Sequence, residues 1–358
     1  MVNRISTTGK YSQLVADMQR NLFNYNKLTQ QLASGSRLTS ITDDPIASVN
    51  VLNTNRQLGQ IDTFAQNVDL AQSELSTLDD LMELATGYLS SAWDRAVQAN
   101  NQTYSGTSLE ALKVEIDETI KTMVDLANTE YNDNYIFGGA NTKLTPYEID
   151  EDGNIIYRGT THDNPDYIRR TEVADGVFEV INTTGDKVFG YYKAEFEYAD
   201  KDGKKVIENV DADGKKTYTY EDGTAFTGKK EDLKATIVNE EYSGVMGAMK
   251  LLSNSIQMVL DGDTEAGYKQ MNSTLDMFKN SLRTISEEQT KFGGVANRLD
   301  MTTSTLETNS DNLTAYLSST RDIDYPEAIS NWLQAQYAYQ ASLQVSSSAM
   351  GMSLLNYL

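Results

Sequence analysis

Cysteine is absent from the sequence, and histidine occurs only once, at His162. The absence of cysteine excludes disulfide bonds, cysteine-based zinc sites and thiol catalysis. A single histidine excludes a multi-histidine metal site, and any Ser–His–Asp arrangement would have to be built around His162. Much of the usual chemistry of enzymes is therefore missing before any pattern is considered.

Positive charge and long apolar runs are also scarce. The 358 residues hold 52 acidic against 30 basic side chains, which gives a formal net charge of −22. That balance argues against binding nucleic acid or anionic membranes through bulk electrostatics. No apolar run is long enough to span a membrane, and the mean hydropathy is −0.49. Residues 1–20 contain no apolar block with a small-residue cleavage site, so no Sec-type signal peptide is expected.

Proline is rare, and its positions permit long helices. None of the four prolines falls within 46–145 or 166–325. Apolar residues recur at alternating spacings of three and four, which is typical of helices that pack along their length. Helices are therefore predicted over about 11–32, 45–99, 109–132, 245–260, 264–320 and 327–357. The adjacent glycines Gly293 and Gly294 weaken the fifth helix locally.

A loop joins the first two predicted helices. Gly35 stands where a helix would end, because the residue after the last turn often adopts a positive φ. Asp44 can cap the free N–H groups of the next helix, and Pro45 fits its first position without losing a hydrogen bond. Pro326 follows an acidic segment in the same way and marks a second junction. The apolar rows of both terminal helices are interrupted by polar residues and bury too little apolar surface to be stable alone, so we expect these helices to be mobile in a free monomer and ordered against partners.

Residues 141–240 differ from the flanking helices. Short alternating runs such as 177–181 and 194–198 predict strands. Asp-Gly pairs separate the runs, and Asp-Gly between such runs predicts a hairpin turn; the pairs begin at Asp152, Asp175, Asp202, Asp213 and Asp222. We therefore predict a β-rich insert between two helical segments.

Four features of the insert could carry chemistry, and each has a simpler interpretation. Residues 223–230 nearly match a phosphate-binding loop, but Lys230 occupies the position that needs a hydroxyl. Residues 209–214 resemble half of a calcium loop, but Tyr220 replaces the final carboxylate, and hairpin turns explain the pattern. His162 lies in a polar loop typical of surface histidines. The tyrosines at 191, 192, 198, 218 and 220 could face a carbohydrate, although aromatic residues on a sheet face are commoner. We predict no catalytic, cofactor or metal site.

The predicted order is helical arm, helical body, β-rich insert, helical body and helical arm. The fold class is mainly α, with long antiparallel helical rods and an inserted β-rich outer domain. The terminal arms comprise 1–40 with 323–358, the body 41–140 with 241–322, and the insert 141–240. Periodicity alone leaves two interpretations of the arms open. They either close an ordinary intramolecular bundle or pack with copies from neighbouring subunits in a heterologous ring or tube.

Several motifs at both ends resemble the flagellin superfamily, and within it the hook-associated proteins of the hook–filament junction. The similarity covers about 1–140 and 241–358 and leaves out the insert. Its motifs are residues 3–7 (NRIST), 31–38 (QLASGSRL) with 43–47 (DDPIA), 134–139 (NYIFGG), 322–329 (DIDYPEAI) and 353–358 (SLLNYL). Two positions depart from the family pattern: Ile41-Thr42 stands where Pro-Ser is usual, and Pro326 replaces a helix-compatible residue. The second departure could shift the first turn of the arm.

The resemblance implies a structural protein of the flagellum with a flagellin-like coiled-coil bundle. It implies export of the unfolded chain by the flagellar type III export apparatus, with an uncleaved N-terminal signal and a dedicated chaperone. The exported copies would form a ring in the extracellular axial tube, between the first hook-associated protein and flagellin. The arms would line the channel, the body would form the next shell and the insert would face outward. Neither nucleic acid nor a membrane is an expected partner.

Assembly is then the expected mechanism, and named residues carry it. Six leucines would be buried only between copies, namely Leu14, Leu28, Leu32, Leu333, Leu343 and Leu354. Charge-assisted contacts of Arg37, Asp43 and Asp44, next to Pro45, would fix the corner loop. Two alternatives are a minor flagellin and, from another class, a secreted enzyme with its chemistry in 141–240. The ending at 353–358 argues against the first, and the scarcity of catalytic residue types argues against the second.

Overall fold

The computed structural model describes residues 7–101, 106–210, 216–228 and 230–355, of which the side chains of 7, 8, 10, 11, 210, 231 and 349–355 are not described. The Asp213-Gly214 pair and the side chain of Leu354 lie outside this description, as do parts of the motifs at 3–7 and 353–358. The chain divides into two compact units. Unit 1 comprises Met1–Ala65 with Thr303–Leu358, and unit 2 comprises Gln66–Thr302.

Seven α-helices lie in the described residues, and six of them are the predicted ones. They are α1 (Thr7–Ser34), α2 (Pro45–Ala99), α3 (Gly106–Ala127), α4 (Gly185–Val188), α5 (Gly244–Leu260), α6 (Thr264–Arg321) and α7 (Tyr325–Leu355). Helix α6 is the longest, as predicted, and it continues through Gly293 and Gly294 without a break. Helix α3 ends five residues before Asn132, because β1 begins at Glu130.

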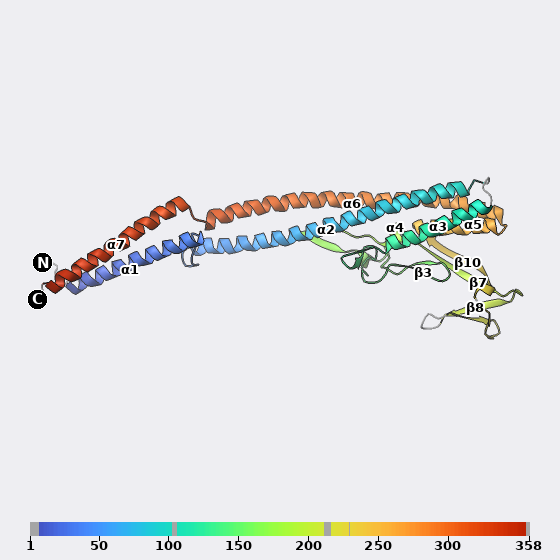
Figure 1. Cartoon of the computed structure of the whole chain (residues 1–358), viewed down its shortest axis with the longest axis horizontal. Helices are drawn as coiled ribbons and strands as arrows, with labels where there is room; N and C mark the ends of the chain where they lie inside the picture. The colour runs from blue at the N-terminus through green and yellow to red at the C-terminus, as the bar shows by residue number, and fades with distance from the viewer. Residues whose placement is uncertain (1–6, 102–105, 211–215, 229, 356–358) are drawn as a thin grey trace. The chain divides into compact units, whose positions relative to one another are not determined.

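Unit 1 contains an antiparallel pair formed by α1 and α7 (Figure 1). The Tyr25 ring stacks on Tyr339 at 6.1 Å and lies 5.8 Å from Trp332, whose indole N–H donates to Thr29 Oγ1 at 2.9 Å. The start of α1 and the end of α7 therefore lie together, as the predicted out-and-back path requires. Pro326 sits in the first turn of α7, where its missing N–H is not needed. Mobility of the arms in a free monomer stays a prediction.

Unit 2 is built on the rest of α2 and α6 together with α3 and α5. Antiparallel pairing of α2 and α6 brings Gln72 Nε2 within 2.7 Å of Asp300 Oδ1 and Asn100 Nδ2 within 2.7 Å of Asn272 Oδ1. The predicted apolar spacing of α2 is buried from Val68 to Ala99, and Met271, Phe278 and Ile285 of α6 are fully buried. The helix-period pattern therefore marks the core of this unit correctly.

The strands lie between α3 and α5, close to the range predicted for the insert. They are β1 (Glu130–Tyr131), β2 (Asn134–Tyr135), β3 (Tyr147–Ile149), β4 (Ile155–Tyr157), β5 (Arg170–Ala174), β6 (Val177–Val180), β7 (Tyr191–Ala199), β8 (Lys205–Val210), β9 (Lys216–Tyr220) and β10 (Lys234–Ser243). An antiparallel six-stranded sheet has the order β3-β4-β7-β8-β9, with β10 also paired to β7. Strands β1–β2 and β5–β6 form separate hairpins, and two short 3₁₀ turns span Pro165–Tyr167 and Lys230–Asp232.

Four of the five predicted Asp-Gly turns are confirmed. The glycines at 153, 176, 203 and 223 have φ between +69° and +84°, in the region that favours glycine. The carboxylate of Asp150 accepts the N–H groups of Asp152 and Asn154. In the same way, the carboxylate of Asp200 accepts the N–H groups of Asp202 and Lys204. These contacts explain the Asp-x-Asp-Gly pattern at 150–153 and 200–203 as turn geometry.

Candidate assembly interface

The corner between α1 and α2 is held against the end of α6 in unit 1. Gly35 follows α1 with φ +67°, as predicted, and its carbonyl accepts the N–H of Ile323 at 3.1 Å. Arg37 donates twice to this end of α6. Its backbone N–H reaches the carbonyl of Arg321 at 2.7 Å, and its guanidinium reaches that of Thr320 at 2.9 Å. These donors satisfy carbonyl groups that a helix end otherwise leaves free.

Asp43 organises the loop itself. Lys27 Nζ lies 2.7 Å from Asp43 Oδ1, while Oδ2 accepts the Thr39 hydroxyl at 2.8 Å and the N–H groups of Thr39 and Ser40 at 3.2 and 3.1 Å. The hydrogen bond from Lys27 and those from Thr39 hold the pKa of Asp43 well below its usual range. Asp43 is thus a charged acceptor that fixes one loop conformation.

The two helix starts that follow the corners are capped alike. Asp44 Oδ1 accepts the N–H of Ala47 at 3.0 Å directly before Pro45, and Asp324 Oδ1 accepts the N–H of Glu327 at 3.3 Å beside Pro326. In each case a carboxylate satisfies a free N–H of the first turn. Arg37, Asp43, Asp44 and Pro45 therefore lie together at one corner, and their role in assembly stays a prediction.

An Asp43→Asn variant should loosen this corner at neutral pH. The neutral amide loses the charge-assisted bond to Lys27, and we expect the amides of Thr39 and Ser40 to exchange hydrogen about tenfold faster. The folded-state pKa of Asp43 is lowered, so its stabilisation is complete above the unfolded pKa of about 4 and disappears as the pH falls through the folded value. Hydrogen exchange should show the full difference between variant and wild type from pH 5 to pH 8.

Asp17→Asn, which alters only the exposed ion pair with Arg20, is the matched control. Equal exchange in Asp43→Asn and wild type would contradict the role of the carboxylate.

The three leucines predicted for α1 lie on its side that packs against α7. Leu14, Leu28 and Leu32 are half-buried, and the heptad spacing places Leu32 on the same side as Tyr25. Leu28 also lines the groove between the two helices, together with Ala335 and Ala338. This side of α1 is therefore partly covered within a single chain.

Leu333, which was predicted for α7, lies on a different side of the helix from the contact with α1, whereas Leu343 follows Tyr339 by one turn and lies at the border of that contact. The residues toward α1 include Trp332 and Tyr339, whereas Leu333 is 39% exposed, Leu343 43% and Ile329 47%. Tyr337 and Val345 are also exposed, at 66% and 55%. Helix α7 thus has apolar residues on most of its surface, and only one side is covered within the chain. A helix that is apolar all round is normally buried.

Sequence reasoning missed a second apolar surface in unit 1. Ile46, Val49 and Leu52 in the first turns of α2 are exposed by 76%, 54% and 62%, and Ile41 in the corner loop by 67%. The three helical residues recur at a spacing of three rather than in a heptad pattern, so the search for heptads passed over them. A search for any one-sided apolar spacing would have found them.

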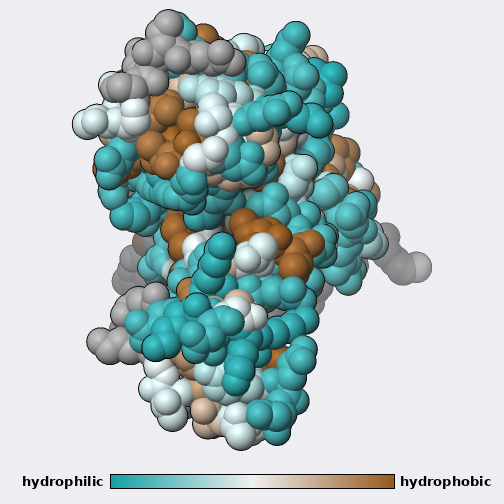
Figure 2. All heavy atoms as spheres, turned by 90° about the vertical axis from the view of Figure 1, so that its right-hand side faces the viewer, coloured by the Kyte–Doolittle hydropathy of each residue, from teal (hydrophilic) through white to brown (hydrophobic). Residues whose placement is uncertain are grey.

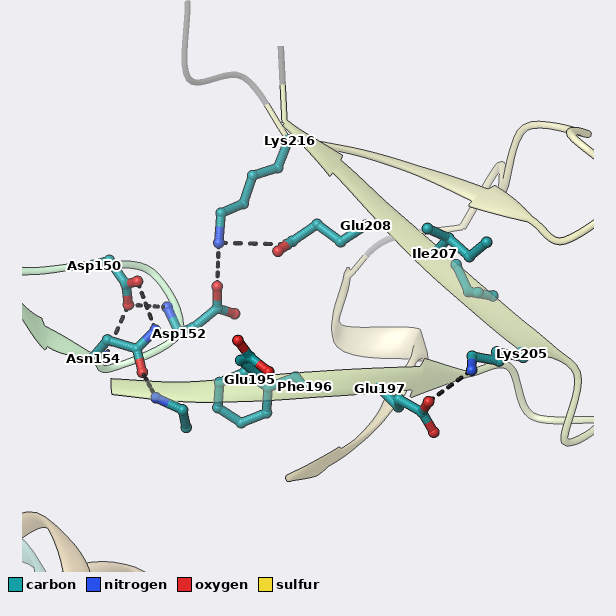
Figure 3. Close-up of a pocket in the computed structure, with 12 residues that line it drawn as sticks. Asp150, Asp152, Asn154, Glu195, Phe196, Glu197, Lys205, Ile207, Glu208 and Lys216 are labelled. Carbon is teal, nitrogen blue, oxygen red and sulfur yellow. Dashed lines mark hydrogen bonds and ion pairs between the residues drawn. The ribbon is translucent and has the colours of Figure 1, made fainter. Parts of the chain in front are cut away.

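The insert holds a pocket of about 380 Å³ that is lined by charged side chains, several of which pair with one another (Figure 3). Asp152 is buried and receives ion pairs from Lys216 and Lys230 and a hydrogen bond from the Tyr198 hydroxyl at 2.9 Å. Hydrogen bonds from these three groups outweigh burial and lower the pKa of Asp152. Lys230, the last position of the loop-like motif at 223–230, is therefore committed to a carboxylate. The cluster joins the β3–β4 turn to the outer part of the sheet.

The remaining candidates of the insert are structural. Each described tyrosine of the predicted set donates its hydroxyl to a carboxylate, as Tyr218 does to Glu208 at 2.8 Å and Tyr220 to Asp200 at 3.1 Å. His162 Nδ1 lies 2.7 Å from the carboxylate of Asp186, which also accepts the His162 N–H. Asp186 was not anticipated, because it lies 24 residues away. Within the described ranges, no group of three or more histidine, aspartate or glutamate residues could hold a metal ion.

No helix in the described part of the chain combines the length and the apolar character that crossing a membrane requires.

Comparison with known proteins bears on both ends of the chain. Residues 5–142 match the bacterial flagellin N-terminal helical region, and residues 275–358 match the bacterial flagellin C-terminal helical region. Flagellar hook-associated protein 3 of Salmonella typhimurium is 24% identical over 355 residues, and that of Escherichia coli is 22% identical over 352, each alignment covering 98% of both chains. A flagellin of Clostridium tyrobutyricum is 23% identical over 88% of this chain and 90% of its own length.

Solved structures share the fold. A putative flagellar hook-associated protein from Vibrio parahaemolyticus superposes with a TM-score of 0.57 at 15% identity, covering 78% of this chain and all of the other. A flagellar junction protein from Legionella pneumophila gives a TM-score of 0.51 at 17% identity, covering 77% of this chain and all of the other.

The fold and the corner motifs define an axial protein of the flagellin type, with helical ends and an inserted β-rich region. The chain belongs to the bacterial flagellin family, and over its whole length it resembles flagellar hook-associated protein 3. Its role is therefore that of a structural protein of the bacterial flagellum.

Proposed function

We propose that this chain forms the hook–filament junction, as a ring of copies in the axial tube on which flagellin polymerises. The exposed apolar surface of α7 is the observation that carries the proposal. The 31 residues of α7 contain a single charged side chain, Glu327, while Ile329, Leu333 and Leu343 remain uncovered. An exposed apolar surface of this kind is typical of a site where another chain packs.

The distribution of charge supports packing through unit 1. Unit 1 contains seven basic and nine acidic residues, a net charge of −2, whereas unit 2 contains 23 and 43, a net charge of −20. Closely packed copies of unit 1 thus repel one another little, while the charge of unit 2 keeps the chain soluble. The face of the molecule in Figure 2 is mostly hydrophilic, with hydrophobic residues confined to separate patches.

The partners follow from this location. The ring would contact the first hook-associated protein on one side and flagellin on the other. The chain would reach its place outside the cell through the flagellar type III export apparatus, escorted by an export chaperone. Leu14, Leu28 and Leu32 would complete their burial against neighbouring copies, and Leu333, Leu343 and Leu354 would become buried there. The corner loop would be kept in the conformation that the ring requires by four of its residues, Arg37, Asp43, Asp44 and Pro45.

A minor flagellin is the main alternative, and the similarity to the Clostridium flagellin favours it. Full-length similarity to hook-associated protein 3 and the ending at 353–358 favour the junction. An enzyme on a flagellin-like scaffold is the less favoured alternative, because the charged groups of the insert are used in turns and ion pairs. Hydrolytic activity of the intact chain would support it.

The position of the chain along the flagellum tests the proposal. An epitope inserted between Asp202 and Gly203, in the exposed β7–β8 turn, leaves both helical ends unaltered. Immunogold electron microscopy should then show label only where hook and filament meet. Label along the whole filament would contradict the junction role and indicate a minor flagellin instead. Motility of the tagged strain controls for damage by the insertion.

A further inference from the structure

Unit 2 carries a groove beside α6 that the assembly of unit 1 does not use. The β5–β6 hairpin lies along α6 and is held there by the ion pair between Arg298 and Glu179. Between them is a groove of about 460 Å³, lined in part by Phe178, Val180, Val295 and Gly294. A Cβ atom on Gly294 would meet no neighbour within 4 Å, and the Phe178 ring is 54% exposed. The groove is thus open, with an apolar interior.

Basic side chains border this groove. Lys291 and Arg298 line it together with Glu179, and each has an ion pair within the chain, Lys291 with Glu288 and Arg298 with Glu179. Lys279 and Arg283 continue along the exposed surface of α6 at helical spacing. Their side chains reach water, since Arg283 is 70% exposed and Arg298 61%. Glu287 interrupts the row and pairs with Arg283. These side chains give this surface of α6 a partly basic border within a unit of net charge −20.

The outer surface of α2 has the complementary composition. Leu84 and Tyr88 are 53% and 37% exposed and lie one helical turn apart. Asp80, Glu83 and Asp94 are exposed beside them. Within the described part of the chain these three carboxylates have no ion-pair partner. This surface is therefore apolar with an acidic border.

We infer that the groove receives the outer surface of α2 from a second copy of this chain. Leu84 and Tyr88 enter the groove beside Phe178, while Asp80 and Glu83 face Lys291 and Arg298. Two different surfaces meet, so the contact is heterologous. It leaves the α2 surface free on one copy and the groove free on the other, and further copies can add there until a ring closes. Opposite charges on the two borders set the orientation of neighbouring copies. The inference rests on the proposed ring and names a body contact within it.

Cysteine pairing tests the contact directly, because the natural chain has no cysteine. Flagella are isolated from cells that carry only the full-length Tyr88→Cys/Phe178→Cys chain, oxidised, and immunoblotted on non-reducing gels. A ladder of dimers, trimers and larger multiples is expected, since each copy links to two neighbours. Each single cysteine variant, and a Val114→Cys/Phe178→Cys chain with its first cysteine on exposed Val114 of α3, should stay monomeric.

Each other result overturns the contact. A dimer from a single cysteine variant would mean a symmetric contact, and a product with another flagellar protein would mean a different occupant. Monomer alone from flagella with a complete junction would overturn the groove contact and leave the proposed ring intact. Absence of the chain from the junction in wild-type flagella would instead overturn the ring itself.

Charge reversal gives a second measurement that does not depend on cysteine. Asp80→Lys/Glu83→Lys places four basic groups around the groove, and we expect at least about tenfold less chain in isolated flagella. Neither carboxylate has an internal ion pair, so the fold is not at risk. Glu110→Lys/Asp125→Lys makes the same charge change on exposed α3 positions and should incorporate normally. Normal incorporation of the Asp80/Glu83 variant would contradict the charge pairing.

Discussion

Replacing Leu343 with aspartate abolishes incorporation of the chain into flagella while export continues. Leu343 lies on α7 one turn after Tyr339, at the border of the contact with α1, and is 43% exposed, so a carboxylate there still reaches water in the isolated chain. In the assembled ring the same carboxylate would be buried among apolar side chains without a partner. Burying an unpaired charge costs about 3 kcal/mol or more, which corresponds to roughly a hundredfold loss of incorporation. Immunoblots of culture medium and of isolated flagella measure export and incorporation separately.

The control variant keeps the apolar character of the position. Leu343→Met fills a similar volume and should incorporate as wild type does. Ser330→Asp places the same charge on an exposed position of α7 outside the apolar row and shows whether any charge on this helix is enough. Normal incorporation of Leu343→Asp would contradict the role assigned to α7. Retention of the variant inside the cell would show a defect in export instead.

Gly190→Ala unfolds the region where the sheet meets α5. Gly190 has φ +73°, and an added Cβ would lie 1.9 Å from the carbonyl oxygen of Ser243. Gly244 approaches the same backbone, so neither segment can move aside without losing the hydrogen bonds of Tyr147 to Gly190 and of Met246 to Phe189. We expect a loss of about 4 kcal/mol or more, a large fraction of the stability of a domain. Thermal unfolding and limited proteolysis of the purified chain measure it.

A second glycine separates the clash from the backbone strain. Gly176 in the β5–β6 turn has φ +69°, but a Cβ there meets nothing within 4 Å. Gly176→Ala should therefore cost only about 1 kcal/mol, the cost of a left-handed conformation. Equal losses in the two variants would mean that the close approach of the two backbones is unimportant.

Much of the helical part follows from the sequence because local signals act there without competition. Gly35, Asp44 and Pro45 mark the corner correctly, since a positive φ and a capped first turn depend on neighbouring residues alone. Helix α6 keeps its predicted length despite Gly293 and Gly294, because buried Phe292 and Val295 beside them anchor the helix to the core. Tertiary burial outweighs a propensity penalty of about 2 kcal/mol.

The sequence could not show which side of α7 faces α1. Two apolar rows are present, one with Trp332 and Tyr339 and another with Ile329 and Leu333, and the predicted heptad row contained the second. Pairing uses the first row, because its aromatic rings pack on Tyr25. Periodicity locates apolar rows but does not say whether a row is covered by the same chain or by another.

The sequence could not predict the long-range pairing in the insert, for a related reason. Alternating residues and Asp-Gly turns predicted short strands, and neighbouring strands such as β3 and β4 pair as the turns require. Pairing of β10 with β7 and the ion pairs of Asp152 with Lys216 and Lys230 join segments 35 or more residues apart. Nothing local specifies these partners. The division into arms 1–40 with 323–358, body and insert also stays a prediction.

Electron microscopy of cells that lack this chain, together with an assay of flagellin in the medium, tests the central claim most directly. A junction on which the filament must start predicts bare hooks and abundant unpolymerised flagellin outside the cell. Restoring the gene should restore the filaments. Hooks that still carry filaments in the deletion strain would contradict the proposed junction role.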